Sequence, residues 1–338
     1  MFIIDELINK AKGNSGSIVL PESTDPRVLT AVAKIVAMDL AKVTLLGESE
    51  MINQEAKALN IELNNVTIIN PETSEDIPAF AEAYYQRRKE KGVTMAQAIE
   101  TVKNPLYFGA SMVKEGKVEG MVAGAANITA DVLRAALQVI GVMPGLKTVS
   151  SAFIIPVPDF RGEKRIFLFA DCAVVPNPSS EQLADIAMST ALTRKAIIGD
   201  EPKVALLSFS TLGSAKHELV DKVTMAKDIL TERKVDFDFD GELQVDAAII
   251  PEVAKRKAPQ SSVAGNANIL IFPDLQAGNI GYKLAQYIGK VEAIGPIIQG
   301  LAAPVSDLSR GCSAEDIVNT VAIVLLLADQ QKKEIKKR

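Results

Sequence analysis

The sequence lacks the residues on which several common kinds of chemistry depend. It contains no tryptophan, one histidine (His217) and two cysteines, Cys172 and Cys312, which lie far apart and form no CxxC pair. One histidine cannot supply a Ser-His-Asp triad or a multi-histidine metal site within one chain. Two separated cysteines build neither a disulfide framework nor a zinc cluster. We therefore expect chemistry based on carboxylates, hydroxyls, arginines, lysines or a thiol, with no metal ion and with His217 solvent-exposed in a polar loop.

Aromatic residues, positive charge and long apolar runs are also scarce. Phe, Trp and Tyr together make up 5% of the chain, and the formal net charge is -5. Such a surface does not attract a polyanion, so no nucleic-acid partner is expected. The N-terminal Met-Phe-Ile-Ile-Asp-Glu brings charge too early for a signal-peptide core, and the apolar run 321–328 is too short to span a bilayer. These features predict a cytoplasmic protein without a membrane partner.

The familiar cofactor motifs are missing as well. The chain has no G-x-G-x-x-G, no G-x-x-x-x-G-K-[ST], no H-E-x-x-H and no G-x-S-x-G. Nicotinamide binding by the usual fingerprint and phosphoryl transfer by a P-loop are therefore not expected.

Short β-branched runs alternate with segments of helical periodicity almost throughout the 338 residues. The runs are continuously apolar, as in parallel strands covered on both faces, and the alternation predicts an α/β fold with mostly parallel sheets. We expect strands at 17–20, 43–46, 66–69, 120–123, 149–155, 166–170, 204–208 and 269–272. We expect helices at 26–38, 180–197, 218–232 and 315–336.

The length exceeds that of one hydrophobic core, which favours two domains. The segments 141–145 and 293–296, each containing glycine and proline, are the best places for the chain to cross between them. We therefore expect domain I at 1–145 plus 297–338 and an inserted domain II at 146–296, with an active site in the cleft between them.

Three segments share the order apolar strand, small-residue loop, helix start, which suits an anionic ligand. In 121–134, a loop of small residues precedes a helix carrying Arg134, but Thr129 as a helix cap and Arg134 in a surface ion pair explain the pattern equally well. In 268–283, we expect a glycine-containing turn and then a helix with Lys283 in its first turn, as a phosphate contact or as a solvated lysine.

The third segment, 304–317, has the greatest density of reactive groups. Ser309, Arg310, Cys312 and Asp316 crowd before the last helix, and an arginine offers bidentate geometry to a phosphate. The spacing Ser313-x-x-Asp316 is also that of a capping box, which would stabilise the helix start without any catalysis. Spacing alone leaves both interpretations open.

Several long phrases of this sequence resemble the phosphate acetyltransferase family, also called phosphotransacetylases within the phosphate acetyl/butyryltransferases. They are Ala-Ala-Asn-Ile-Thr-Ala-Asp-Val-Leu-Arg at 125–134, Asp-Gly-Glu-Leu-Gln-Val-Asp-Ala-Ala at 240–248, Lys-Ala-Pro-Gln-Ser-Ser-Val-Ala-Gly at 257–265, Phe-Pro-Asp-Leu-Gln-Ala-Gly-Asn-Ile-Gly-Tyr-Lys-Leu at 272–284 and Pro-Val-Ser-Asp-Leu-Ser-Arg-Gly-Cys-Ser at 304–313. The resemblance runs essentially from end to end, with the phrases in the family's order.

The resemblance implies two α/β/α domains related to the isocitrate and isopropylmalate dehydrogenase fold, a homodimer, and coenzyme A and acetyl phosphate as substrates. It implies catalytic roles for Ser309, Arg310 and Asp316. It implies ligand contacts by Arg87, Arg134, Asn127, Thr129, Tyr282 and Lys283, with Arg88 as the alternative to Arg87.

The sequence departs from the family's usual pattern in places that leave this catalytic set intact. Ser306 stands where Asn is expected, Ala303 and Leu212 replace frequent lysines, and 126–128 replaces a more polar phrase. These changes bear on coenzyme binding and on acyl-chain preference.

The resemblance implies direct thiolate attack in a ternary complex, with Asp316 as the base. A helix N-terminus and a nearby arginine, however, weaken an aspartate as a base. The rival route uses Cys312 as a nucleophile with a pKa lowered at the helix N-terminus. A butyryl-phosphate-specific enzyme and a non-catalytic acetyl-CoA-binding regulatory module, like the related domain of some malic enzymes, are the alternative functions.

Overall fold

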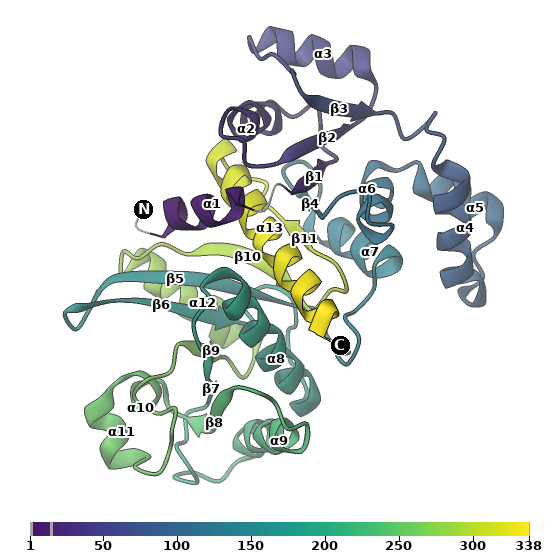
Figure 1. The fold of residues 1–338 in the computed structure, drawn as a ribbon. Coiled ribbons are helices and arrows are strands. Elements are labelled where there is room, and N and C mark those ends of the chain that lie inside the picture. Colours follow the sequence, from purple (N-terminus) through teal and green to yellow (C-terminus); the bar gives the residue numbers. More distant parts are fainter. Residues whose placement is uncertain (1–2, 14–15, 338) are drawn as a thin grey trace. The chain divides into compact units, whose positions relative to one another are not determined.

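The computed structural model describes residues 3–13 and 16–337, with side chains to residue 333 (Figure 1). The chain forms two compact units, Met1–Met143 with Leu301–Arg338, and Pro144–Gly300. The domain boundaries expected from the sequence stay a prediction, and each unit is described by itself.

The first unit alternates strands and helices along the chain. Its strands are β1 (Ser17–Leu20), β2 (Lys42–Leu46), β3 (Val66–Ile69), β4 (Gly120–Ala123) and β11 (Val305–Asp307). Its helices are α1 (Ile4–Lys12), α2 (Pro26–Ala37), α3 (Ser49–Ala58), α4 (Ile77–Arg88), the 3₁₀ turn η1 (Lys89–Lys91), α5 (Met95–Val102), α6 (Pro105–Lys114), α7 (Thr129–Val139) and α13 (Ala314–Lys337).

The strands of the first unit form one parallel sheet in the order β11-β4-β1-β2-β3. Helices cover both faces, as two neighbouring residues of β4 show. A Cβ at Gly120 would meet Val324 of α13, whereas Met121 lies against Gly109 of α6. Because successive strand residues point to opposite faces, α13 and α6 cover opposite sides of the sheet.

The direction of winding reverses between β1 and β4. From β1 the chain continues through α2 to β2 on one side, and after β3 it returns to place β4 on the other side of β1. In open α/β sheets, ligands bind at the carboxyl ends of the strands at such a reversal. The loops that follow β1 and β4 are therefore the first place to look for a site.

The second unit is built around a mixed sheet in the order β10-β5-β6-β9-β7-β8, in which β6, β9, β7 and β8 are parallel and β5 pairs antiparallel with both neighbours. Its strands are β5 (Ser150–Phe160), β6 (Glu163–Ala170), β7 (Lys203–Leu207), β8 (Asp238–Leu243), β9 (Ile269–Ile271) and β10 (Ile294–Gln299). Its helices are α8 (Ser180–Ile197), α9 (Glu218–Glu232), α10 (Val245–Ile249), α11 (Pro251–Lys257) and α12 (Leu275–Tyr287).

The α/β fold class with mostly parallel sheets, expected from the sequence, is confirmed, and every expected strand is present. Three further strands, β8, β10 and β11, were not expected. The strand β8 reads Asp-Phe-Asp-Gly-Glu-Leu, in which charge interrupts the apolar run, and it lies at the edge of its sheet. An edge strand needs fewer apolar residues than a central one, so hydrophobic periodicity is a weak signal there.

The expectation for segment 268–283 was wrong in one respect. The helix α12 already begins at Leu275, with Asp274 as its N-cap, so Gly278 and Gly281 lie inside the helix and Lys283 lies near its middle. A Cβ at Gly278 would come within 2.1 Å of the Asp171 carbonyl oxygen, and one at Gly281 within 2.9 Å of the Phe272 ring. These glycines permit close approach of the helix to its neighbours. In the sequence, the same glycines look like those of a turn.

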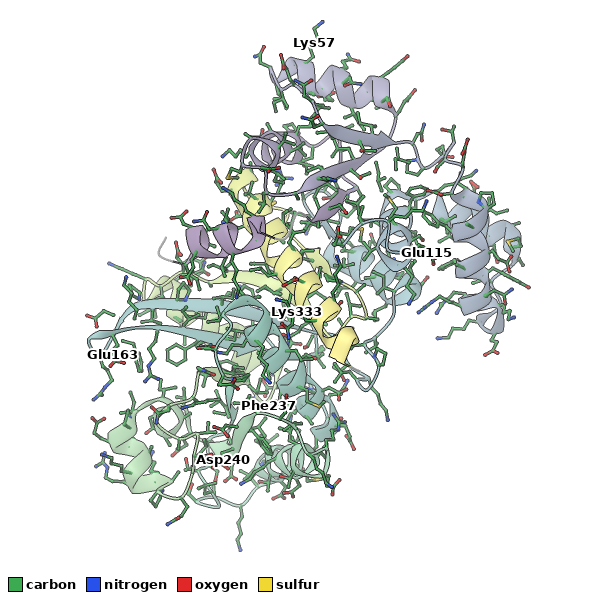
Figure 2. All side chains as sticks on the ribbon, in the orientation of Figure 1. Lys57, Glu115, Glu163, Phe237, Asp240 and Lys333 are labelled. Atoms are coloured by element: carbon green, nitrogen blue, oxygen red, sulfur yellow. The ribbon has the colours of Figure 1, made fainter. Side chains whose placement is uncertain are left out.

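Charged side chains cover the outer surface of each unit, as Lys57, Glu115 and Glu163 illustrate (Figure 2). In the described residues, none of the helices has the length and the apolar character needed to cross a membrane.

Candidate active site

Three loops meet at the carboxyl edge of the first unit's sheet. Residues 21–25 follow β1, residues 124–128 follow β4 and residues 308–313 follow β11, and these three strands are neighbours in the sheet. Two of the predicted ligand-contact residues, Asn127 and Thr129, lie in or just after the second loop, and the predicted catalytic segment begins in the third. The fold thus brings together segments that are far apart in the sequence.

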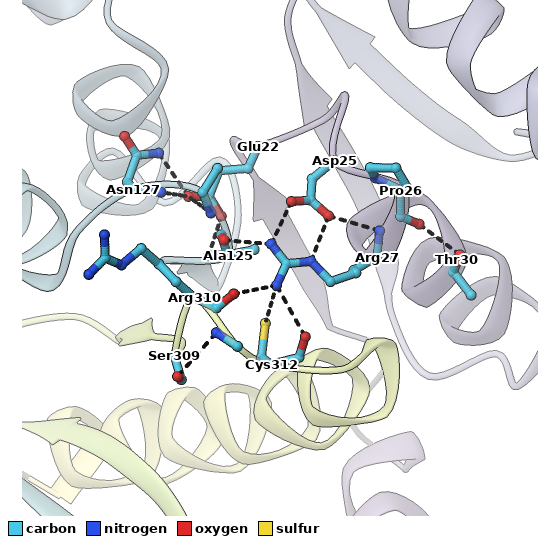
Figure 3. A network of polar contacts seen from close by, with 12 residues as sticks. Glu22, Asp25, Pro26, Arg27, Thr30, Ala125, Asn127, Ser309, Arg310 and Cys312 are labelled. Carbon is cyan, nitrogen blue, oxygen red and sulfur yellow. Dashed lines mark hydrogen bonds and ion pairs between the residues drawn. The ribbon is translucent and has the colours of Figure 1, made fainter.

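Arg27, at the start of α2, ties the three loops together (Figure 3). Its Nη1 donates to the carbonyl oxygen of Arg310 at 2.6 Å and to that of Cys312 at 3.2 Å, and its Nη2 donates to the carbonyl oxygen of Ala125 at 2.6 Å. Its other donors bind the carboxylate of Asp25, at 3.0 and 2.7 Å. The guanidinium is therefore engaged in holding backbone, and its hydrogen bonds to Asp25 lower the pKa of that carboxyl.

Glu22, in the loop after β1, binds the backbone of the loop after β4. Its carboxylate accepts hydrogen bonds from the N–H groups of Ala125 at 2.7 Å, Ala126 at 3.0 Å and Asn127 at 2.7 Å. The Asn127 side chain adds a fourth donor at 2.8 Å. Consecutive N–H groups of this kind form an anion-binding concavity, and here an internal carboxylate occupies it.

Asp307, the last residue of β11, holds the same loop from its other end. Its Oδ2 accepts a hydrogen bond of 2.6 Å from the hydroxyl of Thr129, the first residue of α7. Thr129 is therefore bound to the neighbouring strand, and α7 begins without a side-chain cap from Ile128. Asp307 is 3% exposed, and burial, with the negative charge of Glu22, raises the pKa of its carboxyl to about 6.

A cavity of about 380 Å³ opens beside these loops, within the first unit. It is lined by Pro21, Glu22, Thr24, Asp25, Asn104, Pro105, Leu106, Ala126 and Asn127. The N-terminus of α6, capped by the Asn104 side chain, faces it together with the loops after β1 and β4. A cavity of this size is within the range of small-molecule sites.

The third loop presents the predicted catalytic residues. Ser309 and Arg310 are exposed, and the Ser309 oxygen accepts a hydrogen bond of 3.3 Å from the Gly311 N–H. The Arg310 side chain points away from the Arg27 network (Figure 3).

Asp316 forms the capping box that its spacing suggested. Its Oδ2 accepts hydrogen bonds from the N–H and the hydroxyl of Ser313, both at 2.8 Å, and its own N–H donates to the Ser313 oxygen at 3.1 Å. The carboxylate is exposed on the first turn of α13. Any role of this carboxylate as a base therefore competes with its hydrogen bonds to Ser313.

Cys312 is buried in the same loop, and burial raises the pKa of its thiol although Arg27 opposes the shift. The lowered pKa considered for this thiol at the sequence level is therefore wrong. Desolvation of the charged form outweighs the nearby guanidinium.

Two arginines predicted to contact the ligand, Arg134 and Arg87, lie outside this cluster of loops. Arg134 forms a surface ion pair with Asp131 at 2.6 Å. Arg87, at the end of α4, donates to the carbonyl oxygen of Ile140 at 3.3 Å, just beyond the C-terminal end of α7. The helix α7, which rises about 1.5 Å per residue, therefore separates Arg87 from Thr129 by its whole length. The neighbouring Arg88 is half-buried and interacts with Tyr84.

Tyr282 and Lys283 belong to the second unit. The Tyr282 ring stacks on Phe153 with centroids 4.2 Å apart, and Lys283 is exposed with its Nζ 5.9 Å from the centre of the Tyr282 ring. Both side chains lie on α12, away from its N-terminus. His217, in the same unit, is exposed and caps α9 through its Nδ1, as expected for a solvated residue.

Across the described parts of the chain, no three His, Cys, Asp or Glu residues are grouped so that they could hold a metal ion.

The sequence analysis missed Glu22, Arg27 and Asp307. The available signal was position: Glu22 and Arg27 come within a few residues of the first strand's carboxyl end, and Asp307 ends a strand that was not expected. Asp25 lies just before the helix expected at 26–38, and polar residues at that edge of a parallel sheet are candidates for a site.

Comparisons with known proteins identify the family. Residues 2–325 match the family described as Phosphate acetyl/butaryl transferase. The phosphate acetyltransferase of Thermoanaerobacterium thermosaccharolyticum is 52% identical over 329 residues, which is 97% of this chain and 100% of that protein.

Solved structures give the same result. A phosphotransacetylase from Streptococcus pyogenes superposes with a TM-score of 0.92 at 44% identity, covering 97% of this chain and 98% of that one. A 4-hydroxythreonine-4-phosphate dehydrogenase from Klebsiella pneumoniae, 13% identical, superposes with a TM-score of 0.55 over 93% of this chain and 100% of that one, a likeness of fold alone. The family match over nearly the whole chain, together with relatives of full length, shows that this chain belongs to the phosphate acetyl/butaryl transferase family and is an acyltransferase.

Proposed function

We propose that this enzyme transfers an acetyl group reversibly between acetyl phosphate and coenzyme A, by direct attack of the coenzyme thiolate in a ternary complex. The reaction forms the bond between sulfur and the acetyl carbon and breaks the bond between that carbon and the phosphate oxygen. The thiol proton passes to a carboxylate, and inorganic phosphate leaves. The observation that carries the proposal is the near full-length identity of 52% to a phosphate acetyltransferase.

Asp316 is the proposed base. A free thiol has a pKa of about 8.5, so only a few per cent of it is ionised at neutral pH, and a positioned base is worth roughly 10²–10⁴-fold in rate. The exposed carboxylate supports this role, although its hydrogen bonds to Ser313 compete with it.

Ser309 is the proposed donor to the oxyanion that develops on the acetyl carbonyl. Its oxygen accepts from the Gly311 N–H, which leaves the hydroxyl hydrogen available to the substrate. Donors of this kind contribute roughly 3 kcal/mol to a transition state.

Arg310, with Arg134 and Arg87, is proposed to bind the phosphate and to stabilise it as it leaves. The exposed guanidinium of Arg310 supports this role, since planar bidentate donors suit phosphate oxygens. Arg134 would exchange its surface partner Asp131 for the ligand. Asn127, Thr129, Tyr282 and Lys283 complete the proposed binding set.

We further propose that the two compact units are the two domains expected from the sequence, that the enzyme is a homodimer and that it works in the cytoplasm with diffusible substrates. No metal ion is required by the proposed chemistry, because guanidinium groups stabilise the phosphate charge.

The test is to follow thioester formation from acetyl phosphate and coenzyme A with excess chelator present. Rapid turnover that added phosphate reverses is the expected result. Absence of turnover while acetyl-CoA still binds tightly would favour a non-catalytic acetyl-CoA-binding module instead.

The family description also names butyryl transfer, which makes acyl-chain preference a second question. Comparing kcat/KM for acetyl, propionyl and butyryl phosphate decides it. A rate that rises with chain length would identify a butyryl-preferring enzyme.

A further inference from the structure

The loop at 124–129 is held from both ends by buried carboxylates. Glu22 is 9% exposed and receives four hydrogen bonds from residues 125–127. An anionic ligand cannot use these N–H groups while Glu22 occupies them. The small-residue loop, which resembles an anion-binding loop in sequence, therefore has an internal anion as its ligand.

Asp307 holds the other end of the loop, at Thr129. Its Oδ2 binds the Thr129 hydroxyl, but its Oδ1 is buried and, within the described residues, has no hydrogen-bond partner. A buried carboxylate oxygen without a partner favours the protonated acid. The contact is also close, because a Cβ at Gly124 would come within 2.4 Å of that oxygen.

The two carboxylates influence each other through this loop. The charge of Glu22 raises the pKa of Asp307, while the Thr129 hydroxyl lowers it. The other ionisable groups around Glu22 are Arg27, which is bound to Asp25, and Cys312, whose thiol interacts with Arg27 and Glu22. Asp307 is thus the group of this cluster that changes its charge near neutral pH.

We propose that Glu22 and Asp307 are a pair of positioning residues that hold the 124–129 loop and make its geometry depend on whether Asp307 carries a proton. The proposal rests on the proposed function, because Asn127 and Thr129, which the pair holds, belong to the proposed substrate pocket. Neither carboxylate needs to touch the substrate.

The protonated form of Asp307 is the form that the ordered loop favours. In the ionised form, the buried Oδ1 is charged, has no hydrogen-bond partner among the described residues and is repelled by the Glu22 carboxylate. Ionisation as the pH rises through about 6 therefore loosens the hold on the loop and on the start of α7. The value of kcat/KM should therefore fall about tenfold for each pH unit above that point, apart from any titration of the substrates.

The experiment measures kcat/KM against pH for the wild-type enzyme and three variants. In Asp307→Asn the fall in kcat/KM above about pH 6 disappears, because the amide does not titrate. In Glu22→Gln the fall moves to lower pH, because a repelling charge is gone. In Thr129→Val it moves to higher pH, because the hydrogen bond that favours the ionised form is lost.

The opposite shifts in Glu22→Gln and Thr129→Val are the readout that a merely structural role would not produce. A fall that persists unchanged in Asp307→Asn belongs to a phosphate group of the substrates, whose second pKa is about 6, and overturns the proposal. Equal profiles for the wild type and Glu22→Gln overturn the pairing.

Thermal unfolding tests the pair without any turnover. The raised pKa of Asp307 means that its contribution to stability is fully present below the unfolded value of 3.8 and is lost as the pH rises through about 6. The Tm of Asp307→Asn relative to wild type should therefore increase by several degrees between about pH 4 and about pH 7. A constant difference in Tm overturns the proposal, whereas absence of turnover with the expected Tm shift contradicts only the proposed function.

Discussion

Asp316 has two roles that compete for the same carboxylate, one in the capping box of α13 and one as the proposed base. The Asp316→Asn variant should lower kcat by about 10²–10⁴-fold if the carboxylate removes the thiol proton. Steady-state kinetics of thioester formation measures this. Asparagine retains an oxygen that can accept from Ser313, so the helix start should survive the change.

The matched control removes the cap and keeps the carboxylate. Ser313→Ala deletes the hydroxyl that bonds Asp316 at 2.8 Å and should lower the free energy of unfolding by about 1 kcal/mol, with kcat retained or raised. If Asp316→Asn reduces kcat less than about tenfold, Asp316 is a cap and not a base.

Cys312 separates the two mechanisms. Because burial raises the pKa of its thiol, the thiolate is scarce at neutral pH, and Cys312→Ala should retain kcat within a few fold. Alanine fills the site imperfectly, so a modest fall in Tm is expected as well. Loss of turnover in a well-folded Cys312→Ala protein, together with an acetylated wild-type chain detected by mass spectrometry, would instead establish a covalent route.

Among the elements, the loop after β4 depends on Gly124. Its φ is +108°, a conformation that side-chain-bearing residues rarely adopt, and a Cβ there would come within 2.4 Å of the Asp307 Oδ1 and 2.6 Å of the Leu308 nitrogen. Gly124→Ala should therefore lower the free energy of unfolding by more than about 1 kcal/mol and reduce kcat/KM at least tenfold, because the loop must move away from β11. Chemical denaturation and kinetics measure the two effects.

Gly116 provides the control for backbone strain alone. It also has a positive φ, +70°, but a Cβ there meets nothing within 4 Å. Gly116→Ala should lower the free energy of unfolding because of the same backbone strain, and it should leave kcat/KM unchanged. If both variants lose the same stability and neither loses activity, the close approach of Gly124 to Asp307 has no role in the site.

For the whole molecule, we predict a homodimer. The apolar side chains of Ile280, Leu284, Tyr287 and Ile288 are exposed on and just after α12, and a second copy would remove such surface from water. Sedimentation equilibrium should therefore give twice the chain mass of 36.2 kDa at micromolar concentration. A mass of one chain at the highest concentration used for kinetics would contradict the prediction.

The fold class followed from local patterns because each central strand is a short apolar run that is buried whatever its neighbours are. The strands at 17–20 and 120–123 begin and end where those runs do. The edge strand β8 and the three-residue strand β11 did not follow, because they are strands only by virtue of the partner with which they pair. Local periodicity does not indicate which distant segments of the chain pair.

The sequence by itself determined the family, the α/β class and the residues that carry the proposed chemistry, since long phrases and apolar periodicity are local properties of the chain. Only the tertiary structure decided what those residues contact. It placed the Glu22 carboxylate against the N–H groups of the loop after β4, engaged Asp316 in a helix cap, buried the Cys312 thiol and brought Asp307 beside Thr129. Hydrogen bonds, burial and the resulting pKa values depend on which distant segments meet, and the order of strands in the sheet decides that.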